Sequence, residues 1–154
     1  MSSNIYAGFG ASYARSFYTD VFNVERSRSF DNQYSTNATI GWRIDNDWEL
    51  GAQFVAMGGN AYAPLNDSAS KARAMEVFVS DQYMKAHLPG YFTFNARVDK
   101  RFHFQQSSIT LYLTLLNALN IHNTKTIEWN PYSKSIVTTK HIGLLPVLGV
   151  EWQL

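Results

Sequence analysis

The segment from Tyr91 to Phe102 alternates between apolar and polar side chains almost without interruption, and only Lys100 departs from the pattern. Phe92, Phe94, Ala96, Val98 and Phe102 share one parity, whereas the other carries Asn95, Arg97, Asp99 and Arg101. Because successive side chains of a β-strand point to opposite faces, this strand has one apolar side and one side with charges of both signs. Its fold must therefore place one of the two sides against water.

The same alternation recurs along the chain, and helical periodicity does not. It predicts about six strands, near residues 5–17, 34–44, 48–57, 91–102, 108–116 and 142–154. We therefore expect an all-β chain whose amphipathic strands form an antiparallel meander.

The connections between these segments alternate in length. Asp45-Asn46-Asp47 and Gln105-Gln106-Ser107 are tight turns, and the long connections cover residues 19–33, 58–90 and 121–141. Short turns at one end and long loops at the other are typical of a bacterial outer-membrane β-barrel. A soluble sandwich or a lipocalin has less reason to keep this asymmetry.

Composition excludes several other classes of protein. The formal net charge of +1 gives no electrostatic basis for nucleic-acid binding, and the absence of cysteine removes disulfide frameworks and thiolate metal sites. No apolar run is long enough for a membrane helix. The N-terminal residues lack the basic and apolar regions of a signal peptide, so we expect none. A length of 154 residues suits a single domain.

Aromatic residues on the apolar parity gather near the short turns and the C-terminus. These residues are Trp42, Trp48, Phe102, Phe104 and Trp152. In a meander they fall at one height, which predicts an aromatic girdle at the periplasmic boundary of a membrane. Single tryptophans are more often ordinary core residues, but five aromatics at one height favour the girdle.

The polar parity predicts an aqueous lumen, which charged side chains can line without losing their hydration. The expected lumen-facing residues are Arg43, Glu49, Gln53, Asn95, Arg97, Asp99, Arg101 and Glu151. The apolar parity then faces outer-membrane lipid.

The last six residues read Gly-x-x-aromatic-x-hydrophobic, with Gly149, Trp152 and Leu154 at the defining positions. This pattern resembles the C-terminal signal that the barrel-assembly machinery recognises in outer-membrane proteins. Val147 replaces a usually polar residue, and Leu154 replaces the commoner terminal Phe. The alternative interpretation is a final amphipathic strand without such a signal.

Several short motifs, in order, resemble the C-terminal end of the barrel of TonB-dependent receptors, particularly those of Bacteroidota. They are Gly58–Pro64, Leu88–Phe92, Arg97–Phe102, Leu111–Leu113, Asn117–Asn120 and Gly143–Gly149. Their order and spacing agree from Tyr34 to the end of the chain. Thr93 and Asn95 stand where such receptors often carry Arg and Asp, which changes the charge of the lumen but not the strand pattern.

The resemblance implies energy-coupled uptake of a scarce nutrient across the bacterial outer membrane: an iron chelate, cobalamin, an oligosaccharide or a peptide. In that family a plug domain inside a barrel of about 22 strands contacts the TonB-type energy transducer. Neither the plug nor its transducer-binding box is found in this sequence. We therefore expect residues 1–154 to be a single partial barrel, roughly its last quarter. The rest of the barrel, the plug and, through the plug, the transducer would be its partners.

Catalytic and cofactor sites are not indicated. His87, His103, His122 and His141 lack metal-ligand spacing, and no phosphate-binding loop or hydrolase elbow is present. Turn chemistry explains Asp45-Asn46-Asp47 better than an acid/base pair does. We expect no enzyme and no cofactor. The candidate extracellular ligand contacts, all on long loops, are Tyr62, Tyr83, Trp129 and Tyr132.

Two other classes remain open at this point. One is a complete small outer-membrane barrel acting as a porin-like channel or a structural protein. The other is a soluble β-barrel that binds a lipophilic ligand inside. The strand count argues against the first, because closed single-chain barrels begin at about eight strands. The chemistry of the two faces argues against the second.

Overall fold

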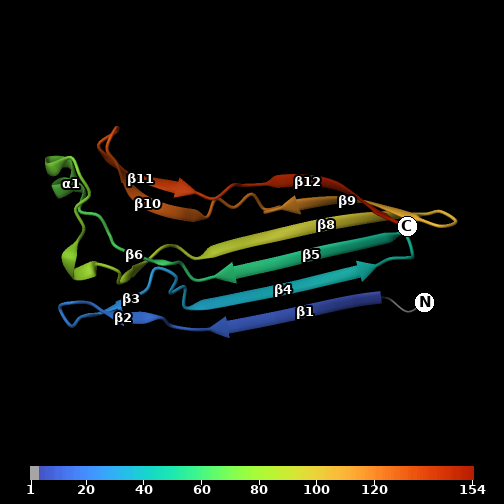
Figure 1. Ribbon diagram of the computed structural model, residues 1–154, viewed down its shortest axis with the longest axis horizontal. Helices are drawn as coiled ribbons and strands as arrows, with labels where there is room; N and C mark the ends of the chain where they lie inside the picture. Colours follow the sequence, from blue (N-terminus) through green and yellow to red (C-terminus); the bar gives the residue numbers. More distant parts are fainter. Residues whose placement is uncertain (1–3) are drawn as a thin grey trace.

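The computed structural model describes residues 4–154, and its largest element is an antiparallel six-stranded sheet (Figure 1). The strands are β1 (Asn4–Tyr13), β4 (Tyr34–Arg43), β5 (Trp48–Met57), β8 (Tyr91–His103), β9 (Ser108–Leu116) and β12 (Leu145–Gln153). They are ordered β1-β4-β5-β8-β9-β12, so every strand pairs with its neighbours along the meander. The predicted all-β antiparallel fold is confirmed, and each of the six strands overlaps a predicted segment.

The long connections contain structure that the alternation pattern did not predict. Three two-stranded sheets pair β2 (Phe17–Thr19) with β3 (Glu25–Ser27), β6 (Ala61–Tyr62) with β7 (Ala86–His87), and β10 (Thr124–Asn130) with β11 (Ser135–Lys140). Helix α1 (Asp67–Arg73) and a 3-10 turn (Ser80–Gln82) lie between β6 and β7. The described chain thus has twelve strands in four sheets rather than about six strands in one.

The two ends of the six-stranded sheet differ, as the connection lengths predicted. The three small sheets and α1 lie at one end, which we call the loop end (Figure 1). The two tight turns lie at the opposite end, the turn end, together with both ends of the described chain (Figure 1).

The outer strands are shorter than predicted because the pairing of β1 stops at a loop residue and that of β12 gives way to side-chain bonds. The N–H of Ala14 still donates to the carbonyl of Gln33 in the β1–β4 register, and the positive φ of Gln33, 65°, then ends the pairing. Before β12, the carbonyl of Ile142 accepts from Asn117 and the N–H of Leu144 donates to Asn120. These bonds replace ladder bonds, so β12 begins at Leu145.

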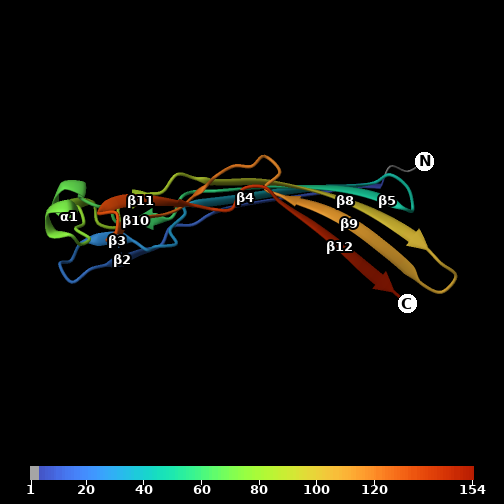
Figure 2. The same cartoon turned by 90° about the horizontal axis from the view of Figure 1, so that it is seen from above.

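The sheet is curved and open. Figure 2 shows β9 and β12 turning away from the plane of β4 and β5. Within residues 4–154 no strand pairs with the outer edge of β1 or of β12. This chain therefore does not close a barrel by itself in the described structure.

The described residues contain almost no hydrophobic core, although 45% of the chain is hydrophobic. Only Ala61 and Trp129 are buried apolar residues among them. The apolar parity lies open instead: the side chains of Phe9 and Leu148, for example, are 77% and 80% exposed. A water-soluble domain of this length hides most of its large apolar side chains. The apolar face of this sheet consequently needs another apolar surface to shield it from water.

Glycines on the opposite face accommodate tyrosine rings from the neighbouring strand. A Cβ atom on Gly41 or Gly149 would lie 2.1 Å from the ring of Tyr6 or Tyr112, respectively. These are directly paired residues, so each tyrosine covers the glycine across from it. Gly51 is different, because its added Cβ would meet nothing closer than 3.8 Å. Alanine should displace the tyrosine at Gly41 or Gly149 and fit at Gly51.

Candidate functional site

All eight predicted lumen-facing residues lie on one face of the six-stranded sheet, which we call the polar face. Strand register aligns Arg43 with Glu49, Glu49 with Asp99, and Gln53 with Asn95. Arg97, Asp99 and Arg101 are alternate residues of β8 and so share a face. Thr110 of β9 pairs with Arg101 on one side and with Glu151 of β12 on the other, which places Glu151 on the same face. The strand register thus places these residues on one face, and the lumen that this face would line stays a prediction.

Ion pairs and polar contacts join six of these eight residues. The Arg97 guanidinium contacts both carboxylate oxygens of Asp99, at 2.6–3.0 Å. Arg43 Nε lies 3.2 Å from Glu49 Oε2, and Asn95 donates to Gln53 at 3.0 Å. Arg101 and Glu151 contact other neighbours, namely Thr110 at 3.4 Å and Gln153 at 2.8 Å. Exposed pairs of this kind add only about 0–1 kcal/mol each, so their main effect is to line the face with balanced charge.

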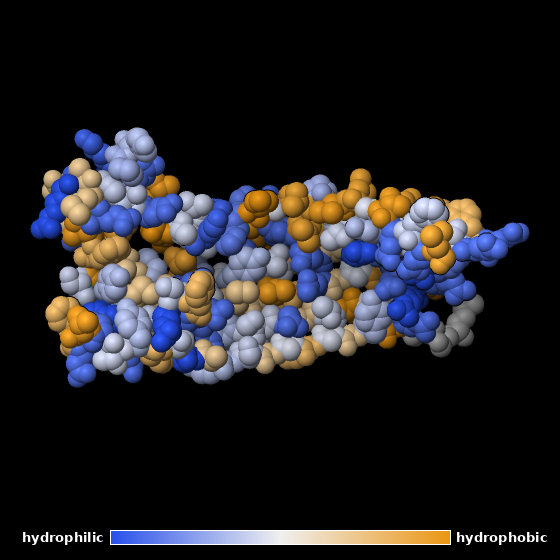
Figure 3. Space-filling model, viewed as in Figure 1, coloured by the Kyte–Doolittle hydropathy of each residue, from blue (hydrophilic) through white to orange (hydrophobic). Residues whose placement is uncertain are grey.

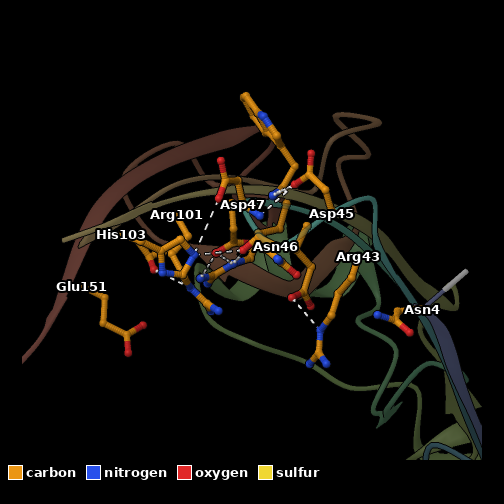
Figure 4. Close-up of a pocket in the computed structure, with 13 residues that line it drawn as sticks. Asn4, Arg43, Asp45, Asn46, Asp47, Arg101, His103 and Glu151 are labelled. Carbon is orange, nitrogen blue, oxygen red and sulfur yellow. Dashed lines mark hydrogen bonds and ion pairs between the residues drawn. The ribbon is translucent and has the colours of Figure 1, made fainter. Parts of the chain in front are cut away.

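The polar face forms a hollow of about 670 Å³ at the turn end. Figure 4 shows Asn46, Asp47, Arg101 and His103 together on one side of it, with Arg43 and Asn4 on the other. His103 Nε2 lies 3.6 Å from Asp47 Oδ1. Figure 3 shows hydrophilic side chains gathered over the same end. Charges of both signs line the hollow, as suits a surface in contact with water.

Lys100, the one charged residue on the apolar parity, reaches out of that face. Its Nζ lies 2.9 Å from Asp47 Oδ2 and 4.8 Å from the centre of the Trp48 ring. The aliphatic stem thus crosses apolar surface while the ammonium group reaches the tight turn, as lysines do at the boundary between apolar and aqueous surroundings. Lys100 can therefore occupy an apolar position of the strand, because Asp47 in the neighbouring hairpin pairs with its ammonium group.

The tight turn beside Lys100 is organised by Asp45. Its Oδ1 accepts from the backbone N–H groups of Asp47 and Trp48, at 2.8 and 2.7 Å. These bonds, that from Asp47 foremost, lower the pKa of the Asp45 carboxyl. The geometry agrees with the turn role inferred from sequence rather than with an acid/base pair.

The predicted girdle residues occupy the turn end of the apolar face. Trp42 pairs with Leu50 and Trp48 with Lys100, while Phe102, Ile109 and Trp152 form one row across β8, β9 and β12. Phe104 adjoins the turn, where its N–H donates to Ser107. All five side chains are exposed, from 40% at Trp48 to 66% at Trp152. Their contact with a membrane stays a prediction.

The residues of the C-terminal pattern lie on or beside the outer strand β12. Gly149 lies beneath the Tyr112 ring, Trp152 is on the apolar face, and Leu154 follows the strand with its side chain 93% exposed. Nothing in the described chain covers the outer edge of this strand. An assembly factor could therefore reach these residues, and the signal itself stays a prediction.

Polar contacts of Asp31 also hold the long connections together at the loop end. Asp31 is fully buried and lies 3.2 Å from the Arg15 guanidinium, and His87 Nε2 lies 3.7 Å from the same carboxylate. Burial by itself would raise the pKa of Asp31, but hydrogen bonds from Ser27, the Ser16 N–H and Arg15 outweigh it and lower that pKa. His87 lies within the predicted connection 58–90, and its approach to Asp31 brings that connection against the one from residues 19–33.

A second carboxylate at the loop end is held in the same way. Asp20 accepts from the backbone N–H of Val24 at 3.0 Å and from Arg26 Nε at 2.6 Å, and these bonds lower its pKa. Arg26 also donates to the carbonyl of Tyr83, at 2.6 Å. The β2–β3 hairpin is thereby tied to the segment that follows α1.

Acidification should loosen the loop end, because both carboxylates have lowered pKa values in the folded chain. Their stabilising effect is complete above the ordinary value of 3.8 and is lost as pH falls from there through the lower folded pKa values. We expect hydrogen exchange in residues 14–33, measured from pH 6 to pH 3, to show lost protection only below that value. Asp31→Asn should lose protection already at pH 6. Equal protection in Asp31→Asn and the unmodified chain would contradict this.

The motifs that carry the family resemblance have structural roles at the loop end. Asn123 accepts from the N–H of Phe92 and donates to its carbonyl, at 3.0 and 2.7 Å, as a neighbouring strand would. Asn117 donates to the carbonyls of Ile121 and Ile142. A Cβ on Gly58 or Gly59 would strike a backbone carbonyl within 2 Å, at 1.9 and 1.7 Å. The double glycine therefore permits close backbone contact, and Asn123 is a residue that sequence reasoning missed.

The four candidate ligand contacts are not equivalent. Tyr132 is 97% exposed at the tip of the β10–β11 hairpin, and Tyr83 is 37% exposed. Tyr62 is half-buried on β6. Trp129 is only 6% exposed, so its ring is not available to a ligand in this structure. Tyr83 lines a hollow together with Tyr18, Arg26 and Phe78, and none of the other three candidates lines it.

The described residues hold no group of three or more histidine, aspartate or glutamate side chains arranged to bind a metal ion. Across residues 4–154, no helix has the length and apolar character needed to cross a membrane. No protein-family model matches the chain, and no curated protein or solved structure matches it either.

Proposed function

We propose that the chain is the C-terminal part of the barrel of a TonB-dependent receptor in a bacterial outer membrane, which takes up a scarce nutrient by energy-coupled transport. The nutrient classes are those of the family: an iron chelate, cobalamin, an oligosaccharide or a peptide. The observation that carries the proposal is the division of one six-stranded sheet into an open apolar face and an ion-paired polar face.

The energetics of the two faces favour a membrane setting. Covering a large apolar side chain such as Phe9, Leu148 or Val150 gains about 1.5–3 kcal/mol, and lipid supplies that cover along the whole face. The polar face gains nothing from an apolar cover, because its ion pairs would lose their hydration. A soluble barrel with a lipophilic ligand inside would need the apolar face turned toward its interior and the polar face toward water.

Strand length and strand ends also support the proposal. The six strands are 9 to 13 residues long, close to the 9–11 residues with which a tilted strand crosses a bilayer. The tight turns and the row of aromatic residues lie at the turn end, and the long connections joined by ion pairs lie at the loop end. This is the arrangement of periplasmic turns, girdle and extracellular loops in such barrels.

The proposed role of this part is to form a wall of the transport path. Upstream strands would pair with the open edges of β1 and β12, and a plug would lie against the polar face and contact the TonB-type transducer. The barrel-assembly machinery would receive the chain through the end of β12, at Gly149, Trp152 and Leu154. In this role the chain needs no cofactor and performs no catalysis.

Orientation provides the test of this proposal. Protease added to intact cells that produce the receptor should cut within residues 58–90, because that connection would lie outside the cell. The turn Asp45–Asp47 should be cut only after the outer membrane is opened. Cleavage at Asp45–Asp47 in intact cells would contradict the topology, and absence of the chain from the outer-membrane fraction would contradict the function.

A further inference from the structure

A second hollow, of about 420 Å³, lies on the polar face near the loop end, and we call it the loop-side hollow. It is formed by the end of β5, the start of β8 and the β10–β11 hairpin. Its size is within the range of small-molecule sites. In the proposed receptor it would be reached from outside the cell.

The lining of this hollow combines an apolar floor with one lysine, one imidazole and one tyrosine. Val55, Met57, Leu88 and Pro89 supply apolar surface, and Tyr91, Lys125 and His141 supply polar groups. No aspartate or glutamate lines it within the described chain, whereas five acidic side chains line the hollow at the turn end. Lys125 and His141 make no ion pair with any described residue. A second lysine, Lys140, donates to Thr124 of the lining, at 2.8 Å.

The polar side of this hollow is held in place by backbone contacts. The Asn123 side chain binds both backbone groups of Phe92, next to Tyr91, and the Asn123 carbonyl accepts from the N–H of His141 at 2.8 Å. The rings of Tyr91 and His141 consequently meet edge to face, with centroids 5.4 Å apart. Tyr91 and His141 are therefore already in position before a ligand binds, which reduces the entropy lost on binding.

We infer that the loop-side hollow binds small organic anions that carry an apolar body, with Lys125 opposite the anionic group. An anion is favoured because Lys125 lines the hollow, Lys140 adjoins it at Thr124, and no described carboxylate lines it in competition. An apolar body is favoured because the floor would otherwise expose Val55, Met57 and Leu88 to water. The inference deepens the proposed function, on which it rests for access from the cell exterior, by assigning the substrate an anionic group.

Binding can be measured on the full chain in lipid nanodiscs, with Met57 as the reporter. Met57 lines the hollow, and a Met57→Leu variant identifies its ¹³C-methyl NMR signal. The hollow lies on the central strands β5 and β8, so pairing of chains through β1 or β12 leaves it open. The probes are benzoate, benzylamine as its cationic counterpart, and acetate as an anion without an apolar body.

Benzoate should shift the Met57 signal in a saturable way, acetate should require higher concentrations, and benzylamine should not compete. Lys125→Gln should raise the apparent Kd for benzoate about fivefold, which is the contribution of one exposed ion pair. Lys85→Gln, an exposed lysine outside this hollow, is the matched control and should change nothing.

Equal shifts with benzoate and benzylamine, or equal Kd values for Lys125→Gln and Lys85→Gln, would overturn the inference. The proposed function fails by a different result, namely absence of the chain from the outer membrane. If the chain bound benzoate but was absent from the outer membrane, the anion site would stand and the receptor function would be refuted. Correct location without a benzoate shift would refute the anion site alone.

Discussion

Refolded alone in detergent, the chain is expected to form multimers rather than a heat-modifiable monomer. The outer edges of β1 and β12, ten and nine residues long, have no partner strand in the described structure. Backbone N–H and C=O groups that face hydrocarbon without a partner cost several kcal/mol each. Pairing edge to edge with another copy would satisfy them, and so would pairing with the upstream strands that the proposed function requires.

Adding a fragment that contains the upstream strands should convert these multimers into a single heat-modifiable species. Size-exclusion chromatography with light scattering gives the mass, and electrophoresis of unheated and heated samples gives the mobility shift. A monodisperse, heat-modifiable monomer obtained without any partner would refute the partial barrel. It would favour a complete small barrel whose closing strands are not paired in this structure.

Replacement of Leu113 by arginine should be the most destabilising single change in the sheet. Leu113 lies on the apolar face of β9 between Val98 and Leu148, far from both strand ends. An arginine on the lipid face near the midplane costs about 2–4 kcal/mol. Urea unfolding of the reconstituted barrel in vesicles measures this loss as a change in the free energy of unfolding.

Thr114→Arg is the matched control, because Thr114 is the next residue of the same strand and faces Arg97 on the polar side. We expect it to cost far less, since an aqueous lumen hydrates the added charge. Arg97→Leu should likewise be mild. If Thr114→Arg or Arg97→Leu proved costlier than Leu113→Arg, the inside and outside of the sheet would have to be exchanged.

The sequence was most informative where one strand face differs from the other. Alternation located all six long strands and placed Arg43, Gln53 and Asp99 on one face, because register follows from parity once the strands pair. It overestimated the last strand, because Asn117 and Asn120 replace ladder bonds there with side-chain bonds. It overestimated the first strand, because the pairing with β4 ends beside Gln33, which has a positive φ of 65°. The alternation of apolar and polar residues cannot reveal where side chains take the place of backbone partners.

The loop end was much harder to predict. Two- and three-residue strands such as β6 and β2 are too short to show a period, and α1 has only seven residues. Asn123 binds Phe92 across 31 residues of sequence, and Asp31 meets His87 from a different connection. Such contacts depend on how separate connections pack together, which no local pattern encodes. The loop-side hollow was invisible for the same reason.

The most direct test of the central assignment is the accessibility of spin labels along β8 in lipid bilayers. The chain contains no cysteine, so single-cysteine variants at each of residues 94–99 carry one label apiece. Labels at Phe94, Ala96 and Val98 should be relaxed by oxygen, which concentrates in lipid. Labels at Asn95, Arg97 and Asp99 should be relaxed by a water-soluble nickel chelate, giving a period of two residues. Absence of that period, or oxygen accessibility at the odd rather than the even positions, would contradict a sheet with lipid on its apolar face and water on its polar face.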